Sequence, residues 1–195
     1  MTLTAAPPPV RADLVPAGLP VHWGQVATAL GPVFVAASPE GVINVSTSEG
    51  TADAFAARLD AELGGRAHLI AAANVPLQAA LEQLAAYFAG AGRAFDVPLD
   101  WRLLQATAFY RSVLVAMADV PWGHLVSYSE LARRVGSPRA ARAVGHACAL
   151  NPLPILIPCH RVVYAGGGIG GYGGPGIAYK RALLAIEGVV FADGG

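Results

Sequence analysis

A thiol, an imidazole and a guanidinium follow one another at Cys159, His160 and Arg161, directly after the apolar, proline-rich run 151–158. A cysteine attacks as its thiolate, and a nearby histidine or arginine increases the fraction of thiol that is ionised at neutral pH. Because neighbouring side chains of an extended chain point to opposite sides, a bridging water or a bend after Pro158 would be needed to connect the thiol to the imidazole. We predict that Cys159 is a nucleophile; the alternative is an inert, buried cysteine.

The other cysteine, Cys148, is interpreted as a small apolar residue rather than as a second reactive thiol. Two cysteines and five histidines show none of the paired spacings of a structural zinc site, so no metal is expected. The first 20 residues lack the basic and apolar regions of a secretory signal. We therefore expect a cytoplasmic protein with reduced thiols.

A glycine-rich segment, residues 166–174, follows the reactive motif. No Gly-Lys-Ser or Gly-Lys-Thr comes after it, so it lacks the pattern of a phosphate-binding loop, and no nucleotide cofactor is expected. Glycine lets the backbone approach a ligand closely. We expect this segment to line a pocket, with Tyr172 as its one aromatic residue.

Two helices that lie ahead of the reactive motif are predicted from their caps. Thr107 is expected to cap the first, which ends before Pro121. Ser127 and Glu130 form a capping box, in which each side chain satisfies a backbone N–H at the start of the second helix. Gly136 supplies the left-handed stop of that helix.

A third helix is predicted from Arg139 to about Leu150, because Ser137 is a good cap and Pro138 favours the first helical position. With the preceding helix it has the pattern of a helix-turn-helix, whose second helix carries Arg139 and Arg142. One of its faces is nearly bare and is formed by Ala140, Ala141, Ala143, Gly145 and Ala147. Such a face packs inside a core or lies against nucleic acid, where Arg142 is the one long side chain that could reach inward.

The last predicted helix, residues 179–187, stops at Gly188 and ends in a carboxylate, Glu187. A carboxylate in this position is either solvated or, alternatively, orients His160.

The first half of the chain is predicted to be α/β. Two apolar strands, 32–37 and 42–45, surround a turn and form a hairpin. Asn74 caps an amphipathic helix that ends at Gly90. We divide the chain at a linker within residues 92–100. The predicted parts are a flexible Pro/Ala-rich tail (1–20), an N-terminal α/β domain (21–97) and a C-terminal catalytic and DNA-binding domain (98–195).

The net charge of zero hides an asymmetry between the two halves. Residues 1–100 carry four basic and nine acidic residues, a net charge of −5, whereas residues 101–195 carry nine basic and four acidic residues, a net charge of +5. The arginines that gather within 29 residues are Arg133, Arg134, Arg139, Arg142 and Arg161. Such asymmetry indicates that the basic half has a polyanionic partner.

Apolar residues make up 54% of the chain and charged residues 13%, against roughly 25% charged in an average globular domain. This composition provides a core and excludes disorder for most of the chain. The most apolar stretches are interrupted by charged residues or by Asn and Pro, so no membrane-spanning helix and no membrane partner are expected.

Residues 107–188 resemble the O6-alkylguanine-DNA alkyltransferases, also called methylated-DNA–protein-cysteine methyltransferases. The motifs that carry the resemblance stand in the family's order: Ser127-Tyr128, Arg142-Ala143-Val144-Gly145, Asn151-Pro152, Pro158-Cys159-His160-Arg161-Val162-Val163, Gly170-x-Tyr172-x-Gly174 and Leu183-Leu184-x-x-Glu187. The first half is similar to the family only in outline. The resemblance implies a ribonuclease-H-like α/β (α+β) domain with a small antiparallel sheet, followed by a mainly helical, winged helix-turn-helix-like domain.

The resemblance also implies a reaction, in which Cys159 accepts the alkyl group of O6-alkylguanine, or possibly of O4-alkylthymine, and is consumed in one turnover. His160 would take the thiol proton through a water, and Glu187 would orient and stabilise the imidazolium. Tyr128 would assist the leaving guanine as a general acid, and Asn151 would brace the turn that supports the thiolate.

The DNA-binding role is implied in the same way. A base inside a duplex must be rotated out of the stack, at a cost of a few kcal/mol, and Arg142 matches the arginine that fills the vacated space from the minor groove. Further expected DNA contacts are Ala141, Ala143, Gly145 and Arg139. The expected pocket residues are Tyr172, Pro154 and Val162. The partner is duplex DNA, and a monomer is expected.

Two alternatives from other functional classes remain open at this point. One is a damage-responsive helix-turn-helix regulator, and the other is a cysteine hydrolase that turns over many times. The glycine-rich segment departs from the family pattern at Gly173, where some members carry Ser, and Pro175, directly after the segment, is an insertion.

Overall fold

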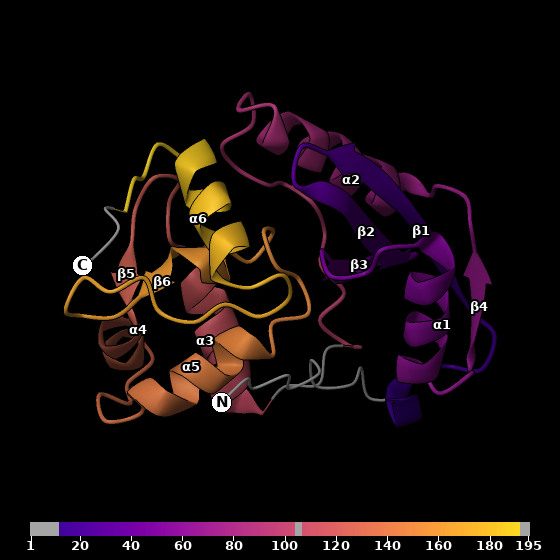
Figure 1. The fold of residues 1–195 in the computed structure, drawn as a ribbon. Helices are drawn as coiled ribbons and strands as arrows, with labels where there is room; N and C mark the ends of the chain where they lie inside the picture. Colours follow the sequence, from indigo (N-terminus) through magenta and orange to yellow (C-terminus); the bar gives the residue numbers. More distant parts are fainter. Residues whose placement is uncertain (1–11, 104–106, 192–195) are drawn as a thin grey trace. The chain divides into compact units, whose positions relative to one another are not determined.

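The described part of the chain forms two compact units in the computed structural model, one ending at residue 103 and the other beginning at residue 107 (Figure 1). The structure describes residues 12–103 and 107–191. The sequence predicts the domain boundary at residues 97 and 98. The segment 98–103 is held to the first unit, because Val42 N–H donates to the Pro98 carbonyl and Asp100 N–H donates to the Val42 carbonyl.

The predicted N-terminal tail is structured from residue 12 onward, and residues 1–11 lie outside the described residues. Residues 12–20 form the 3-10 helix η1 (Ala12–Leu14) and the start of strand β1 (Leu19–Thr28). Val15, between them, is fully buried in the hydrophobic core. Residues 12–20 therefore belong to the first unit.

The first unit is built around a four-stranded sheet in the order β3–β2–β1–β4. Its other strands are β2 (Gly31–Ser38), β3 (Gly41–Ser46) and β4 (Ala67–Ile70). The predicted hairpin is confirmed, since β2 and β3 pair antiparallel. The predicted small antiparallel sheet is confirmed in β1, β2 and β3, and β4 extends it by pairing parallel to β1. The chain reaches β4 through a helix, and a crossover of this kind joins parallel strands.

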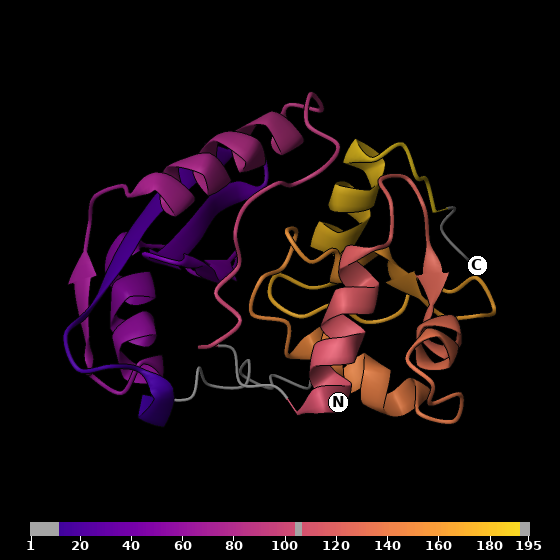
Figure 2. The same cartoon turned by 180° about the vertical axis from the view of Figure 1, so that it is seen from behind.

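Helices α1 (Ala52–Glu62) and α2 (Val75–Phe88) cover opposite faces of this sheet (Figures 1 and 2). On one face, Phe55 of α1 stacks on Phe34 of β2, with ring centroids 5.1 Å apart. Helix α2 begins at its predicted cap, because the Asn74 side chain accepts from the Leu77 N–H. Apolar side chains on both faces explain why β2 is buried along most of its length.

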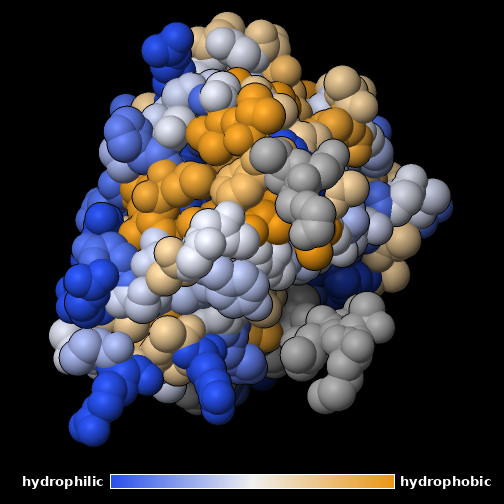
Figure 3. All heavy atoms as spheres, turned by 60° about the vertical axis from the view of Figure 1, so that its left-hand side comes forward, coloured by the Kyte–Doolittle hydropathy of each residue, from blue (hydrophilic) through white to orange (hydrophobic). Residues whose placement is uncertain are grey.

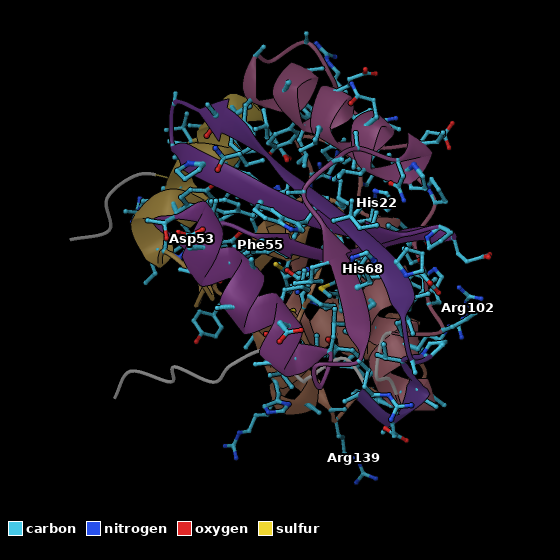
Figure 4. The ribbon with its side chains drawn as sticks, turned by 90° about the vertical axis from the view of Figure 1, so that its right-hand side faces the viewer. His22, Asp53, Phe55, His68, Arg102 and Arg139 are labelled. Carbon is cyan, nitrogen blue, oxygen red and sulfur yellow. The ribbon has the colours of Figure 1, made fainter. Side chains whose placement is uncertain are left out.

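Figure 4 looks onto the first unit and labels residues of its sheet, of α1 and of its last segment, namely His22, His68, Asp53, Phe55 and Arg102. Arg102 projects away from the ribbon, and its guanidinium pairs with buried Asp100 at 2.8 Å. The Asp100 carboxylate also accepts from Ser38 of β2 at 2.6 Å. Burial raises the pKa of Asp100, but the bonds from Arg102 and Ser38 outweigh this effect and lower it. These bonds fix the end of the first unit to its sheet.

The second unit is mainly helical. Its elements are α3 (Ala108–Ala118), β5 (Val126–Ser127), α4 (Tyr128–Arg134), α5 (Ala141–Ala149), η2 (Cys159–Arg161), β6 (Val162–Val163) and α6 (Ile177–Ile186). The predicted caps Thr107 and Ser127 are confirmed, each accepting from a backbone N–H three residues on. Within the part of the chain that is described, no helix has both the length and the apolar character needed to cross a membrane.

Three local predictions in the second unit need correction. Helix α5 begins at Ala141 rather than Arg139, because the Ala140 N–H donates to the Ser137 carbonyl and closes a turn before the helix. The Glu130 carboxylate pairs with arginines of its own helix, so only the Ser127 half of the capping box forms. Helix α6 begins two residues earlier than predicted, at Ile177.

Candidate active site

A short parallel pair of strands brings distant parts of the second unit together. Strand β5 pairs with β6, so that Val126 lies opposite Val162 and Ser127 lies opposite Val163. Tyr128 follows β5 and Tyr164 follows β6, and their ring centroids are 5.4 Å apart. Turn η2, which holds Cys159, leads directly into β6. The pairing therefore places the start of α4 near the candidate nucleophile.

Cys159 lies in a turn that several hydrogen bonds hold in place, and the residue is only 7% exposed. Its N–H donates to the Ile157 carbonyl at 2.8 Å. The Asn151 side chain spans this turn, since its amide donates to the same carbonyl at 2.7 Å and its oxygen accepts from the Leu153 N–H at 3.1 Å. Ile155 has φ of +75°, which is rare for a β-branched residue and indicates strain held by the surrounding structure.

Burial of the Cys159 thiol favours its protonated form. Burial raises its pKa, while a hydrogen bond from Asn151 and the charge of Lys180 lower the pKa by smaller amounts. The sequence predicts that His160 and Arg161 both favour the thiolate. Arg161 does not act in this way, because its guanidinium binds Glu187 instead. A base must therefore take the thiol proton during the reaction.

A buried ion-pair network lies next to the thiol and joins η2 to the end of α6. His160 Nε2 and Glu187 Oε1 are 2.6 Å apart, and both side chains are fully buried. Arg161 donates to both oxygens of Glu187, at 2.8 and 2.9 Å, and to the Val120 carbonyl. The Gly123 N–H also donates to Glu187, at 3.2 Å. The sequence leaves Glu187 either solvated or orienting His160, and the structure supports the second interpretation.

This network keeps Glu187 ionised and His160 neutral. Burial alone raises the pKa of Glu187, but the hydrogen bonds from His160 and Arg161 outweigh it and lower the pKa to about 2. For His160, burial lowers the pKa, and this effect exceeds the opposing one of Glu187. A neutral imidazole that is held by a carboxylate is able to accept a proton, as in the histidine of a hydrolytic triad.

The buried, neutral state of His160 predicts that the protein loses stability in mild acid. Below about pH 6.5 the unfolded chain binds a proton at this residue and the folded chain does not, so the free energy of unfolding decreases as the pH falls. The slope from one such group is at most about 1.4 kcal/mol per pH unit. Urea unfolding of the wild type and of His160→Gln, each followed from neutral to acidic pH, measures this pH dependence of the free energy of unfolding. The variant is expected to show the smaller slope, and equal slopes would contradict a neutral His160.

Tyr128, the first residue of α4, lies between α5 and the glycine-rich segment. A Cβ atom added to Gly145 of α5 would contact its ring at 3.8 Å, and one added to Gly170 would come within 2.9 Å of its hydroxyl oxygen. Burial raises the pKa of Tyr128, with smaller contributions from the thiols Cys148 and Cys159. The phenol is therefore protonated at neutral pH and available as a hydrogen-bond donor.

The three residues predicted to line the pocket differ in their accessibility. Tyr172 is half-buried and stacks on Tyr179, with centroids 6.3 Å apart. Pro154 is half-buried and forms an isolated bridge with Ile157 in the Asn151 turn. Val162 is fully buried in β6. Their role in a pocket stays a prediction.

The predicted DNA-binding residues lie on or next to α5. Arg142 and Ala143 are exposed, and Ala141 and Gly145 are half-buried. Arg139 lies in the turn before the helix and projects away from the protein (Figure 4). In Figure 3, which brings the second unit forward, hydrophilic side chains extend along the left and lower edges around a hydrophobic area. Of the five clustered arginines, Arg161 is buried and is removed from the predicted basic surface.

Sequence reasoning missed two features of this site. The charge of Arg161 predicts a place among the surface arginines, although its position directly after His160 makes a shared carboxylate possible. Lys180, the only lysine in the chain, has no predicted role in the site. It is fully buried, and its pKa is lowered by burial to about 8.

Two family models match the chain, one over each unit. The 6-O-methylguanine DNA methyltransferase, ribonuclease-like domain, matches residues 21–101. The 6-O-methylguanine DNA methyltransferase, DNA binding domain, matches residues 108–189. Together they cover most of the chain.

Two curated relatives, both named methylated-DNA–protein-cysteine methyltransferase, match the chain over different lengths. The "Methylated-DNA--protein-cysteine methyltransferase" of Mycobacterium tuberculosis is 38% identical over 167 residues, which are 86% of this chain and 92% of the relative. The constitutive Bacillus subtilis protein of that name is 40% identical over 117 residues, 60% of this chain and 69% of the relative.

Solved structures agree with these matches. The crystal structure of Mycobacterium tuberculosis OGT in complex with DNA has a TM-score of 0.70 and 38% identity, covering 85% of this chain and 92% of that one. The O6-methylguanine-DNA methyltransferase of Pyrococcus kodakaraensis has a TM-score of 0.60 and 26% identity, covering 87% and 99%.

Proposed function

The chain belongs to the 6-O-methylguanine DNA methyltransferase family, and we propose that it restores O6-alkylguanine in duplex DNA by moving the alkyl group onto Cys159. It is a methylated-DNA–protein-cysteine methyltransferase that binds DNA and repairs it by alkyl transfer. The observation that supports Cys159 as the acceptor is its place in η2, one residue before a histidine that is paired with a buried carboxylate. We also propose that the protein acts as a monomer.

The transfer begins with a protonated thiol. As the Cys159 sulfur attacks the alkyl carbon, its proton passes through a water to neutral His160, and Glu187 stabilises the resulting imidazolium. The new S–C bond forms while the bond between that carbon and O6 breaks. Asn151 keeps the turn in place, because it bonds to the Ile157 carbonyl that also receives the Cys159 N–H.

The bond electrons leave with guanine, which becomes an anion until it is protonated. Tyr128 donates a hydrogen bond to guanine N3 and offsets this charge, a role that its raised pKa permits because the phenol keeps its proton at neutral pH. The product on the protein is a thioether, from which the thiol is not easily regenerated. Each molecule therefore acts once.

Access to O6 requires that the damaged nucleotide leave the base stack, at a cost of a few kcal/mol. We assign to Arg142 the task of filling the vacated space, since it is the exposed, long side chain of α5. The small residues Ala141, Ala143 and Gly145 allow this helix to approach the minor groove closely. Contacts to phosphates give affinity without sequence preference.

Arg142→Ala is expected to slow transfer from a duplex much more than transfer from the free base O6-benzylguanine. The free base needs no flipping, so the loss of the side chain that fills the space left by the flipped nucleotide affects only the duplex reaction. An unstacking cost of a few kcal/mol corresponds to a loss of about 10- to 100-fold. Single-turnover rates on the two substrates measure it. Equal losses on both would argue against a flipping role, and Arg111→Ala on the exposed face of α3 is the matched control.

Two glycines of the same segment should respond differently to alanine. Gly170 has φ of +76°, and its Cβ would lie 2.9 Å from the Tyr128 hydroxyl, so Gly170→Ala both strains the backbone and displaces Tyr128. A displacement of this kind costs up to about 100-fold in rate. At Gly173 a Cβ would meet the Ala149 carbonyl at 3.5 Å, an ordinary contact, so Gly173→Ala should leave the rate nearly unchanged. Transfer rates of the two variants test this predicted difference, and a loss of the same size in both would contradict the prediction.

The proposal is tested by incubating the protein with an excess of duplex that contains O6-methylguanine and measuring its intact mass. We expect one methyl group per molecule, located at Cys159 by peptide mapping, and guanine in the DNA. Repair beyond one equivalent would indicate the multiple turnovers of a hydrolase. Damage binding without a mass change would favour a regulator. Either result would overturn the proposal.

A further inference from the structure

Lys180 of α6 is fully buried, and its ammonium binds three main-chain carbonyls. The acceptors are those of Val162 at 2.6 Å, Ile169 at 2.7 Å and Gly171 at 3.2 Å. An ammonium has three N–H donors and no acceptor, so these carbonyls use its full capacity. Val162 is the first residue of β6, directly after η2, and the other two belong to the glycine-rich segment. One side chain thus connects the segment to the strand that follows the nucleophile.

The chain has twelve arginines and this single lysine. This one lysine lies at a fully buried position, where the local geometry decides which cation fits. A guanidinium is planar and presents five donors in a rigid fork, whereas an ammonium is compact and directs three donors to carbonyls that converge from different sides. The geometry at Lys180 is the one that an ammonium satisfies.

The glycine-rich segment needs an external restraint. Gly167, Gly170 and Gly174 all have positive φ, and glycine loses more conformational freedom than any other residue when it is ordered. Only its first turn closes on itself, through bonds between the Tyr164 and Gly168 backbones and from Gly167 N–H to Tyr164. Lys180 donates its hydrogen bonds to the middle of the segment, at Ile169 and Gly171.

These bonds fall on either side of the point where the segment meets Tyr128. Ile169 and Gly171 are the neighbours of Gly170, whose position next to the Tyr128 hydroxyl leaves no room for a side chain. Tyr172 follows immediately. A shift of the backbone at 169–171 would therefore move the surroundings of Tyr128 and of Tyr172 together.

We propose that Lys180 is a positioning residue for alkyl transfer, which holds residues 169–171 against Tyr128 through three carbonyls so that the guanine site is formed before DNA binds. This inference rests on the proposed function for the identity of the substrate. It does not require Lys180 to touch the substrate.

The protonation state of Lys180 makes the inference testable by pH. Burial lowers its pKa to about 8, and the thiols of Cys159 and Cys148 oppose this effect. His160 is the further titratable group that interacts with it. A neutral amine has only two N–H donors for three carbonyls. Wild-type protein should therefore lose part of the restraint as the pH rises through about 8.

The first experiment compares wild type with Lys180→Met, which keeps a similar volume and removes the donors. We expect transfer from an O6-methylguanine duplex to fall by about 100-fold, as for a misplaced binding site. Hydrogen exchange should show faster exchange confined to residues 164–176. Arg181→Met is the matched control, because this neighbouring cation donates to the Phe191 carbonyl instead. The ratio of wild-type to Lys180→Met rates should decrease above about pH 8, which a purely structural role would not produce.

A second experiment uses the fact that the chain has one lysine. Selective lysine labelling gives a single ε-amine signal by NMR, so its titration is read directly, and we expect a midpoint near 8. In Lys180→Ala, added propylammonium should restore part of the transfer rate, whereas propanol of the same length should not.

The outcomes separate this inference from the proposed function. A wild-type rate in folded Lys180→Met, a rate ratio that is independent of pH, or equal rescue by propanol would overturn the positioning role. If wild-type protein takes no methyl group while Lys180→Met still shows faster exchange at 164–176, the proposed function fails and the restraint of the segment stands.

Discussion

Cys159→Ser protein is expected to take no measurable alkyl group from a duplex that contains O6-methylguanine. A serine hydroxyl in the same turn is a far weaker nucleophile than a thiolate, and removing the nucleophile of a catalytic unit costs at least about 10⁴-fold in rate. Binding to the damaged duplex should persist, because the turn is braced by backbone and Asn151 bonds that the substitution leaves in place. Intact-mass spectrometry after single-turnover incubation measures the transfer, and a gel-shift titration measures the binding.

The chain offers a matched control in its other thiol. Cys148 packs with its sulfur 3.4 Å from that of Met117, and burial raises its pKa strongly. Cys148→Ala should therefore retain transfer. A methyl group found on Cys148 in the Cys159→Ser protein, or loss of transfer in Cys148→Ala, would contradict the assignment of a single acceptor.

The sequence predicted best those features that depend on residues close together in the chain. The caps Asn74, Thr107 and Ser127 are found as expected, since capping is a contact over three residues. The hairpin of β2 and β3 is also such a local feature, because a short turn joins its two strands. Strand β4 shows the limit, because its parallel pairing with β1 is decided by a helix between them and by the packing of the whole sheet.

The candidate site shows the same division. The order Pro158-Cys159-His160 predicts a nucleophile and a base from the sequence. For Glu187 the sequence leaves two interpretations open, and the role of Tyr128 comes from the family resemblance alone. The partner of Arg161 lies 26 residues away, so its charge alone suggested a surface role. The sequence shows only that Lys180 is a single lysine among twelve arginines. Its structural role depends on three carbonyls that the fold brings together.

Glu187→Gln is expected to reduce both alkyl transfer and stability. The amide can no longer stabilise the imidazolium that forms when His160 accepts the thiol proton, which should cost about 10²- to 10⁴-fold in rate. It also leaves the buried Arg161 guanidinium without its counter-charge, a loss of about 3–5 kcal/mol in the free energy of unfolding. Single-turnover transfer and urea unfolding measure the two effects on the same preparation.

Arg161 allows the two effects to be separated. Arg161→Met leaves the His160–Glu187 pair in place, so transfer should fall much less than in Glu187→Gln although stability also decreases. In the double variant neither buried charge remains, and stability should recover relative to Glu187→Gln because an uncompensated charge is the main cost. Transfer should not recover, since the imidazolium still lacks its carboxylate. Recovery of both together would mean that Glu187 acts only through the fold and does not assist His160. If stability does not recover, an uncompensated Arg161 charge is not the main cost of Glu187→Gln.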